Sequence, residues 1–242
     1  AIVTDGVAAA IVADHEAEFV VEPDARGRGH GTAMLERIVA DHDGPGGALR
    51  IWAHGDHPAA RALAASHGLT PVRELLQLRA SVPAVSATVP ASTATTIAAA
   101  TTGLTAFRPG LDDAAWLELN ARAFSFHPEQ GSVSQADLDE LKREPWFDPE
   151  DFLVLRDGDT MIGCCWLKIE DRTVGEFYVV GVLPERQGEG LGRRLVQAGL
   201  ARLAARGIRT ASLYVEADNA PALALYRSFG FTRHSIDIQY EL

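Results

Sequence analysis

The stretch Glu176-Phe-Tyr-Val-Val-Gly-Val-Leu-Pro-Glu-Arg-Gln-Gly-Glu-Gly-Leu-Gly-Arg-Arg-Leu195 decides the fold of this chain. β-Branched and aromatic residues over 177–182 predict a strand, which ends at Pro184 because proline has no N–H for a sheet ladder. Glycines at every second position follow, and apolar residues at helical spacing then predict a helix. The first N–H groups of that helix lack partners within it, so they form an anion site suited to a pyrophosphate.

Other glycine-rich loops have a different spacing. A dinucleotide-binding turn has Gly-x-Gly-x-x-Gly, whereas this loop has Gly188-x-Gly190-x-Gly192, and the Gly-Lys-Ser/Thr of a Walker loop is absent. A helix start that is glycine-rich for packing alone is the remaining alternative. Gln187-x-x-Gly190-x-Gly192 resembles the Gln/Arg-x-x-Gly-x-Gly/Ala signature of GCN5-related N-acetyltransferases (GNATs), whose loop amides hold the pyrophosphate of acetyl-coenzyme A (acetyl-CoA).

The stretch recurs near the start of the chain, where Arg26-x-x-Gly29-x-Gly31 satisfies the same signature. The two copies match at Pro23 and Pro184, Gly27 and Gly188, Gly29 and Gly190, Gly31 and Gly192, and then over 49–54 with 211–216 and 57–69 with 219–231. Two matched sets of this length predict a duplicated unit.

We therefore expect a fold of the α/β (α+β) class with two tandem GNAT-type units, each a mixed, twisted sheet flanked by helices. The first unit covers residues 1–80, lacks the usual N-terminal strand and helices, and is expected to be non-catalytic. Residues 81–103, rich in Ala, Ser, Thr and Pro, predict a linker. Residues 104–242 form the C-terminal catalytic unit.

Turn and capping signals predict most of the individual elements. In the first unit we expect a hairpin over 1–14 that turns at Asp5-Gly6. In the second we expect a strand over 104–108, a helix over 112–124 capped by Asp112 or Asp113, a helix over 134–143 with a capping box of Ser134 and Asp137, a hairpin of 152–156 and 161–169, a strand over 212–216, a helix from Ala220, and closing strands within 231–241.

Composition excludes several classes of protein. Of the 242 residues 47% are apolar, enough for a substantial core, and the net charge of −11 argues against a non-specific nucleic-acid binder. No apolar run approaches the roughly 20 residues of a membrane span. Cys164 and Cys165 are adjacent in a predicted strand and indicate buried thiols of a reducing cytosol. The eight histidines have no metal-ligand spacing, so we predict no metal, and we expect a cytoplasmic monomer without nucleic-acid or membrane partners.

Three further stretches make the resemblance more specific. His127-Pro-Glu-Gln-Gly131, Glu176-Phe-Tyr-Val-Val-Gly-Val182 and Leu213-Tyr-Val-Glu-Ala-Asp-Asn219 resemble the mycothiol synthases, a family of tandem GNATs. In that family the second unit transfers acetyl from acetyl-CoA to the cysteinyl amine of cysteinyl-glucosaminyl-inositol, the last step of mycothiol biosynthesis. The resemblance covers nearly the whole chain.

Acetyl transfer from a thioester to an amine needs a base for the ammonium proton, donors for the oxyanion and an acid for the leaving thiolate. Glu176 begins the central strand, near the splay where GNATs bind both substrates, and is the predicted base; an exposed strand-end glutamate is the alternative. Tyr226, seven residues after Asn219, stands where the resemblance implies a tyrosine against the coenzyme sulfur and is the predicted acid. The alternative is a tyrosine that only packs at a helix end. Because the first unit has Ala64 at the matching position, we expect it to bind acetyl-CoA without catalysing.

The resemblance implies that Glu129, Lys168, Glu176 and Tyr214 contact the acceptor, and a polyol with an ammonium group suits carboxylate, ammonium and phenol partners. From the residues alone, Glu129 and Lys168 would be solvated charges and Tyr214 a core residue between apolar neighbours. Gly181 interrupts a β-branched run, which indicates a bulge or a close approach of the backbone.

Coenzyme binding is expected at both signature loops, at the end of the central strand and at the start of the following helix. In the second unit the residues are Val180, Gly181, Val182, Gln187, Gly188, Glu189, Gly190, Leu191, Gly192, Arg193, Asn219, Ala220, Pro221, Ala222, Leu223 and Ala224. In the first unit they are Val20, Val21, Glu22, Arg26, Gly27, Arg28, Gly29, His30, Gly31, Thr32 and Ala33.

Two other functions remain open from the sequence. One is a tandem acetyltransferase for another amine, such as an aminoglycoside or a protein N-terminus. The other is a coenzyme A-binding sensor without turnover, although such a sensor would not need Glu176 and Tyr226.

Overall fold

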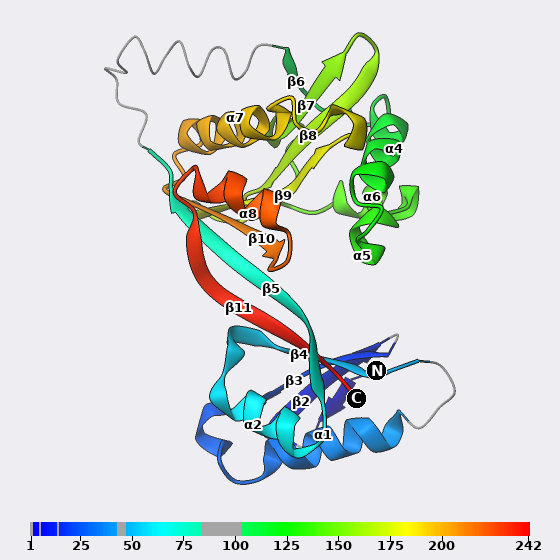
Figure 1. Cartoon of the computed structure of the whole chain (residues 1–242), viewed down its shortest axis with the longest axis vertical. Coiled ribbons are helices and arrows are strands. Elements are labelled where there is room, and N and C mark those ends of the chain that lie inside the picture. The colour runs from blue at the N-terminus through cyan, green and yellow to red at the C-terminus, as the bar shows by residue number, and fades with distance from the viewer. Residues whose placement is uncertain (1, 5, 14, 43–46, 84–102) are drawn as a thin grey trace. The chain divides into compact units, whose positions relative to one another are not determined.

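The computed structural model describes residues 2–4, 6–13, 15–42, 47–83 and 103–242 (Figure 1). The chain forms two compact units, the first from residues 1–77, 215–220 and 233–242 and the second from residues 78–214 and 221–232. Most of the linker expected over 81–103 lies outside the described residues. Each unit is described below by itself.

The first unit is a mixed sheet with two helices. Its strands follow the order β1-β2-β3-β4-β11-β5, in which β3 and β4 are parallel while β1–β2, β2–β3 and β4–β11 are antiparallel. The elements are β1 (Ile2–Thr4), β2 (Ala8–Ala13), β3 (Glu16–Val21), the 3-10 turn η1 (Pro23–Ala25), α1 (His30–Asp41), β4 (Arg50–Ala53), η2 (His54–Asp56), α2 (Pro58–Ser66) and most of β5 (Thr70–Ser81) and β11 (Thr232–Glu241). The hairpin expected over 1–14 is present as β1 and β2.

The helices of the first unit cover one face of its sheet. Burial alternates along β2, where Ala8 and Ala10 are buried and Ile11 is 54% exposed. The buried side packs on Met34, Leu35 and Ile38 of α1. The opposite side carries Ile2, Ile11 and Val20, which are all exposed. In the described part of this unit, α1 and α2 therefore flank the sheet on one face and pack on the same core.

The second unit has five strands in the order β10-β9-β8-β7-β6, with β9 and β10 parallel and the other pairs antiparallel. Its elements are β6 (Leu104–Ala106), α4 (Asp113–Ala123), α5 (Pro128–Gly131), α6 (Gln135–Leu141), η3 (Pro149–Asp151), β7 (Phe152–Asp157), β8 (Thr160–Lys168), β9 (Val174–Val182), η4 (Pro184–Arg186), α7 (Leu191–Ala205), β10 (Thr210–Glu216) and α8 (Ala220–Arg227).

Helices cover both faces of this second sheet, with α4 to α6 on one side and α7 on the other (Figure 1). On the α7 face, Phe177 and Cys165 lie so close to Gly199 that a Cβ there would overlap them. On the α4 face, the fully buried Trp166 contacts Trp116 of α4 edge to face, with ring centroids 5.5 Å apart. The sheet is thus buried on two sides, which explains the nearly continuous burial of β8.

The capping box of Ser134 and Asp137 is confirmed at the start of α6. Asp112 holds the N-cap position of α4 as predicted, but its side chain does not cap the helix. Asp112 instead accepts the Arg108 N–H and Asp113 the Gly110 N–H, both before the helix. The closing strands expected within 231–241 are a single strand, β11. The sequence analysis also missed α5 and the twelve-residue β5.

Candidate functional site

The loop between β9 and α7 leaves the first amides of α7 open. Gly190 precedes the helix in the left-handed conformation, with φ 79° and ψ 7°. The first intrahelical bond runs from the Arg194 N–H to the Gly190 carbonyl at 3.2 Å. The N–H groups of Leu191, Gly192 and Arg193 therefore have no partner within the helix and can donate hydrogen bonds to a bound anion.

The loop of the first unit has nearly the same backbone. Glu22 and Leu183 both have φ −50°, with ψ 134° and 135°. Gly29, at φ 89° and ψ −5°, matches Gly190. Gly27 and Gly188 also have positive φ, 72° and 85°, a conformation that favours glycine. The repeat seen in the sequence is thus also a repeat in conformation.

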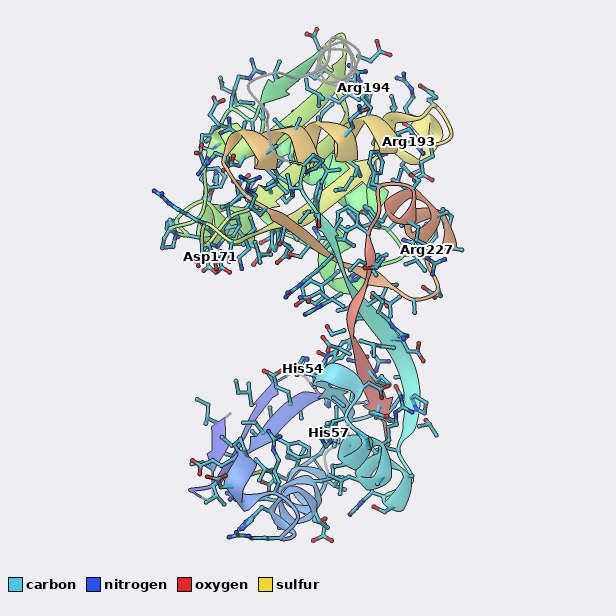
Figure 2. The ribbon with its side chains drawn as sticks, turned by 90° about the vertical axis from the view of Figure 1, so that its left-hand side faces the viewer. His54, His57, Asp171, Arg193, Arg194 and Arg227 are labelled. Atoms are coloured by element: carbon cyan, nitrogen blue, oxygen red, sulfur yellow. The ribbon has the colours of Figure 1, made fainter. Side chains whose placement is uncertain are left out.

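Side chains around the second loop are held by neighbours. Glu189 would repel a phosphate, but its carboxylate accepts from Arg186 at 2.8 and 3.0 Å, and Arg186 also donates to Asp157. Arg193 donates to the Ser228 hydroxyl at 2.9 Å and lies over the Phe229 ring, so it ties α7 to the end of α8. Figure 2 labels Arg193 and Arg194 on α7 and Arg227 on α8, a basic group on the second unit.

In the first loop the residue matching Gln187 is Arg26, whose Nε donates to the Val21 carbonyl at 3.0 Å. Arg28 stands where the second loop has Glu189. The remaining predicted residues of this loop begin α1 (His30, Gly31, Thr32 and Ala33) or end β3 (Val20 and Val21).

Strands β9 and β10 separate after a short pairing. Their register runs from Thr210–Val174 to Ser212–Glu176. Within the described residues β9 then continues to Val182 without further β10 partners. Pairing of β9 with β8 also shifts between Trp166 and Leu167, which leaves Tyr178 as the extra residue. Alternate backbone groups of β9 beyond Glu176, including those of Val180 and Val182, face away from β8 and are therefore available on the β10 side.

The bulge alternative for Gly181 is wrong, since the irregularity lies at Tyr178. The close-approach alternative agrees with the structure. A Cβ at Gly181 would lie 3.3 Å from the Phe124 ring and 3.5 Å from the Ala123 methyl group at the end of α4.

Glu176 lies at the point where the two strands separate, on the α4 face of the sheet. It pairs in register with Lys168 of β8. Burial raises the pKa of the Glu176 carboxyl and Glu170 adds to the rise, while the Lys168 ammonium opposes it. A carboxylate with a raised pKa can accept a proton from an ammonium group more readily than an exposed glutamate can.

Tyr226 lies on the other side of the sheet. It is 9% exposed and its ring centroid is 5.8 Å from that of Phe231, which in turn contacts Phe177 on the α7 face. Burial raises the pKa of the Tyr226 phenol well above its ordinary value. The phenol is protonated at neutral pH, as any tyrosine is, and the raised pKa makes its proton harder to release than that of an exposed tyrosine.

The other predicted contacts occupy different positions. Tyr214 on β10 is 45% exposed, so the core position suggested by its neighbours is wrong. Lys168 is paired with Glu170 at 3.3 Å. The Glu129 side chain lies outside the described part of the structure. The Asn219 N–H donates to the Glu216 carbonyl, and Ala220, Pro221, Ala222, Leu223 and Ala224 form the first turns of α8.

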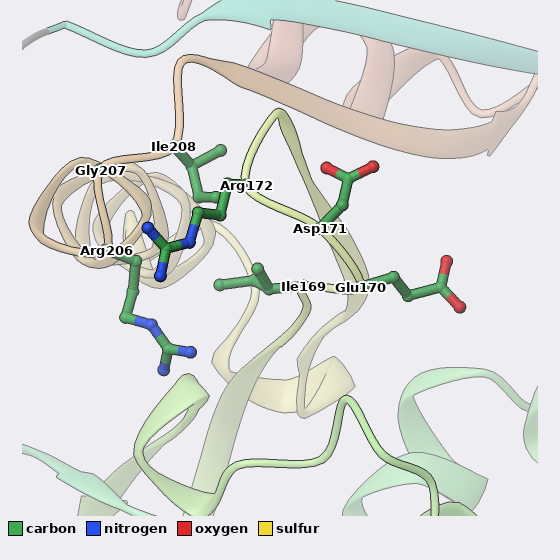
Figure 3. Close-up of a pocket in the computed structure, with 7 residues that line it drawn as sticks. All are labelled: Ile169, Glu170, Asp171, Arg172, Arg206, Gly207 and Ile208. Atoms are coloured by element: carbon green, nitrogen blue, oxygen red, sulfur yellow. The ribbon is translucent and has the colours of Figure 1, made fainter.

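A hollow of about 530 Å³ opens near the start of β9 (Figure 3). It is lined by Ile169, Glu170, Asp171, Arg172, Arg206, Gly207 and Ile208. Arg206 follows the last residue of α7, and α7 has 15 residues, so the hollow lies about 22 Å along the helix from the glycine loop. It is too far from the loop to take the same pyrophosphate, but its wall includes Glu170, which pairs with Lys168.

The first unit has different side chains at the matching positions. Ala64 replaces Tyr226 and is buried in the core. His57, which replaces Asn219, uses its ring Nδ1 to accept the Ala59 N–H and so caps α2. His54, which replaces Glu216, lies between Glu18 and Asp237 at 2.9 and 3.3 Å.

Within the described residues, no group of three or more His, Cys, Asp or Glu side chains could hold a metal ion. None of the helices in the same residues is long and apolar enough to cross a membrane. Both cysteines are buried free thiols, and burial raises the pKa of Cys164 to about 12.

Sequence reasoning missed three groups beside Glu176. They are Tyr178 on the same strand, Trp146 in the turn after α6, and Glu170. Tyr178 could have been found from its spacing of two residues from Glu176 in a strand. Nothing local to Trp146 indicates its position, because it reaches the site through the tertiary fold.

Comparisons with known proteins agree with this geometry. Residues 114–231 match the Acetyltransferase (GNAT) family model. The mycothiol acetyltransferase of Streptomyces griseus is 49% identical over 226 residues, which cover 93% of this chain and 70% of the relative. That of Catenulispora acidiphila is 48% identical over 238 residues, 93% of this chain and 72% of the relative.

Solved structures show the same fold. A GCN5-related N-acetyltransferase from Sphaerobacter thermophilus has a TM-score of 0.74 at 23% identity, over 98% of this chain and 76% of its own. A tandem GNAT protein from the clavulanic acid biosynthesis pathway has a TM-score of 0.65 at 17% identity, over 100% of this chain and 81% of its own.

Proposed function

This chain belongs to the mycothiol acetyltransferase family, and we propose that its second unit transfers the acetyl group of acetyl-CoA to the cysteinyl amine of cysteinyl-glucosaminyl-inositol. The chain is an acetyltransferase with a GNAT domain. The glycine loop supports acetyl-CoA as the acetyl donor, because its free amides suit a pyrophosphate. The acceptor follows from the names of the relatives and from the charged groups around Glu176.

The observation that carries the proposal is the placement of Glu176 and Tyr226 on opposite faces of the sheet, beside the gap between β9 and β10. A thioester that passes through this gap meets a base on one side and an acid on the other. The acceptor amine then approaches from the α4 face and the sulfur lies toward α8.

In this mechanism Glu176 takes a proton from the cysteinyl ammonium, directly or through a water molecule. The free amine attacks the thioester carbonyl, and free N–H groups of β9 near Val180 to Val182 stabilise the oxyanion. The C–N bond forms, the C–S bond breaks, and the thiolate of coenzyme A takes the proton of the Tyr226 hydroxyl. The attacking nitrogen gives up its second proton, which returns through water to the Tyr226 phenolate, and Glu176 releases the first proton to solvent. The products are the N-acetylated cysteinyl compound and coenzyme A.

Acceptor contacts in this proposal come from Lys168, Tyr214, Glu176 and Glu129. The exposed phenol of Tyr214 and the half-buried ammonium of Lys168 can hydrogen-bond the hydroxyls of a polyol. Asn219 and the first turn of α8 would lie along the pantetheine arm.

For the first unit we propose coenzyme binding without catalysis. Its loop keeps the backbone of the second loop, while Ala64 offers no proton to a leaving thiolate. Along the chain, the proposed division is into a non-catalytic part over residues 1–80, a linker over 81–103 and a catalytic part over 104–242, although residues 215–220 and 233–242 belong to the first compact unit. A cytoplasmic monomer is also part of this proposal, and two buried thiols suit a reducing compartment.

Product analysis tests the acceptor. The protein is incubated with acetyl-CoA and cysteinyl-glucosaminyl-inositol, and mass spectrometry with NMR locates the acetyl group. We expect an amide on the cysteinyl nitrogen, and no turnover of glucosaminyl-inositol, which lacks that amine. Turnover of an aminoglycoside or a peptide N-terminus in preference to the cysteinyl compound would favour the other-amine alternative. Binding of acetyl-CoA without turnover of any of these amines would favour the sensor.

A further inference from the structure

The Lys168 ammonium is held at two points outside the strand that carries it. It lies 3.3 Å from the Glu170 carboxylate, and 5.3 Å from the centre of the Trp146 ring, which it faces as a cation–π pair. Its side chain is 25% exposed. A long, flexible side chain is therefore fixed in one direction, beside its register partner Glu176.

Trp146 is itself fixed by the aromatic core. Its ring centroid lies 5.7 Å from that of the fully buried Trp166 and 5.4 Å from that of Tyr178. The turn that carries Trp146 is closed by a hydrogen bond from the Phe147 N–H to the Glu144 carbonyl at 3.0 Å. The ring is thus a rigid support for the ammonium.

The strand irregularity brings these groups to one face. Because Tyr178 is the extra residue of β9, it turns toward Trp166 and Trp146 on the α4 face, the face that also carries Glu176 and Lys168. The charged and titratable groups that face Glu176 are Lys168 from β8, Glu170 from the turn after it, and Tyr178 from its own strand. Glu144, beside Trp146 in sequence, faces Tyr178. Lys168 is the cation in this set.

We propose that Trp146 is a positioning residue of the acetyl-transfer site, whose ring holds the Lys168 ammonium against Glu176 and so keeps Glu176 ionised as the base. The inference rests on the proposed function of Glu176. Without the ring, the ammonium follows Glu170 into solvent, and Glu176 loses its nearest positive charge while its acidic neighbours remain.

The test is the pH profile of kcat/KM for the cysteinyl acceptor in the variant Trp146→Leu. Loss of a nearby positive charge raises the pKa of a carboxylate, so the acidic limb should move to higher pH by roughly half a unit or more. At pH values well above the limb the rate should approach that of the wild type. The KM for acetyl-CoA should not change. Trp146→Phe keeps an aromatic face and should restore part of the shift.

Two controls separate positioning from general damage. The first unit holds a comparable cation–π pair, in which Arg73 lies over the Trp52 ring at 5.2 Å. Trp52→Leu should therefore lower the melting temperature without moving the acidic limb of the pH profile. In a Lys168→Met background the limb is already displaced, and Trp146→Leu should add no further shift, because the ring acts through the ammonium.

An unchanged limb in folded Trp146→Leu would overturn the inference, as would an equal further shift in the Lys168→Met background. If the wild type does not acetylate the cysteinyl acceptor, the proposed function fails. The role of Trp146 is then tested by a measurement that needs no substrate. Carbon-13 NMR of the Glu176 carboxyl then measures its pKa directly. A higher pKa in Trp146→Leu than in the wild type supports the role of Trp146, and equal values refute it.

Discussion

The two glycine loops of this chain have the same backbone and different surroundings. Gly29 and Gly190 both start a helix from the left-handed region, after a 3-10 turn that begins with proline. Around them the side chains have diverged, with Arg28 in place of Glu189, His57 in place of Asn219 and Ala64 in place of Tyr226. The backbone of the anion site is the same in both units, whereas the groups suited to proton transfer, Glu176 and Tyr226, occur in the second unit.

Binding and catalysis therefore depend on different parts of the chain. A pyrophosphate site made of backbone amides needs glycines and a helix start, and it tolerates changes of side chain elsewhere. Proton transfer needs particular side chains at particular points. Changes at matched positions of the two units can therefore separate the two properties.

The largest effect is expected at Tyr226. Tyr226→Phe removes the hydroxyl and little volume, so kcat should fall by roughly 10²–10⁴ with little change in the affinity for acetyl-CoA. Stopped assays and calorimetry measure the two quantities. Near-normal turnover would leave Tyr226 with a packing role only. Ala64→Tyr in the first unit, made as the reciprocal change, should give no new acetylation.

The next effect concerns Glu176. Because its pKa is raised in the folded protein, activity should fall as pH drops through that folded value, and ionised Glu176 should lower stability at neutral pH. Glu176→Gln should thus lower kcat by roughly 10²-fold and raise the melting temperature at pH 7. At a pH below the ordinary pKa of glutamate the two proteins should differ little in stability. A variant that is both active and no more stable would contradict this role.

A smaller effect separates the two helix starts. Replacing a helical glycine by alanine stabilises by about 0.5–1 kcal/mol where space allows. A Cβ at Gly31 meets its neighbours at 3.8 Å or more, whereas one at Gly192 meets Leu225 of α8 at 3.2 Å. Gly31→Ala should therefore raise the free energy of unfolding in urea, and Gly192→Ala should raise it less or lower it. Equal gains would mean that Leu225 moves freely.

The smallest effect lies in the first unit. Burial lowers the pKa of His54, but hydrogen bonds and the charges of Glu18 and Asp237 outweigh it and raise the pKa overall. The stability from this pair is full below the unfolded pKa and is lost as pH rises through the folded value. For a half-exposed pair we expect about 0.2–1 kcal/mol. His54→Gln should remove this pH dependence from the melting temperature.

The sequence predicted the structural features that depend on local residue patterns. The glycine loops, the hairpin of 152–156 and 161–169, whose turn contains Gly158 at positive φ, and the capping box at Ser134 follow from conformations that few residues allow. The repeat was visible because glycine and proline positions survive when side chains change. The positions of Glu176 and Tyr226 on the central strand and on α8 could be inferred in the same way.

Tertiary features could not be predicted from local signals. β5 begins with Thr-Pro and carries charged residues, so its strand character depends on neighbours supplied by distant parts of the chain. Tyr214 has apolar neighbours in sequence but points away from them, because side chains alternate along a strand. Trp146 contacts Lys168 across 22 residues of chain, a contact that no spacing indicates.

The central claim is that the second unit alone carries the reaction, and matched charges in the two loops test it most directly. Both glycines have positive φ, so Gly29→Asn and Gly190→Asn control for backbone strain, and Gly29→Asp and Gly190→Asp add a negative charge at the pyrophosphate. Steady-state turnover is measured for all four, with folding checked by circular dichroism.

We expect Gly190→Asp to lower kcat/KM for acetyl-CoA at least tenfold, about 1.4 kcal/mol, below Gly190→Asn. Gly29→Asp should weaken coenzyme binding to the first unit and leave acetylation largely intact. If Gly29→Asp remains folded and loses turnover as completely as Gly190→Asp, the first unit takes a direct part in the chemistry and the account is wrong.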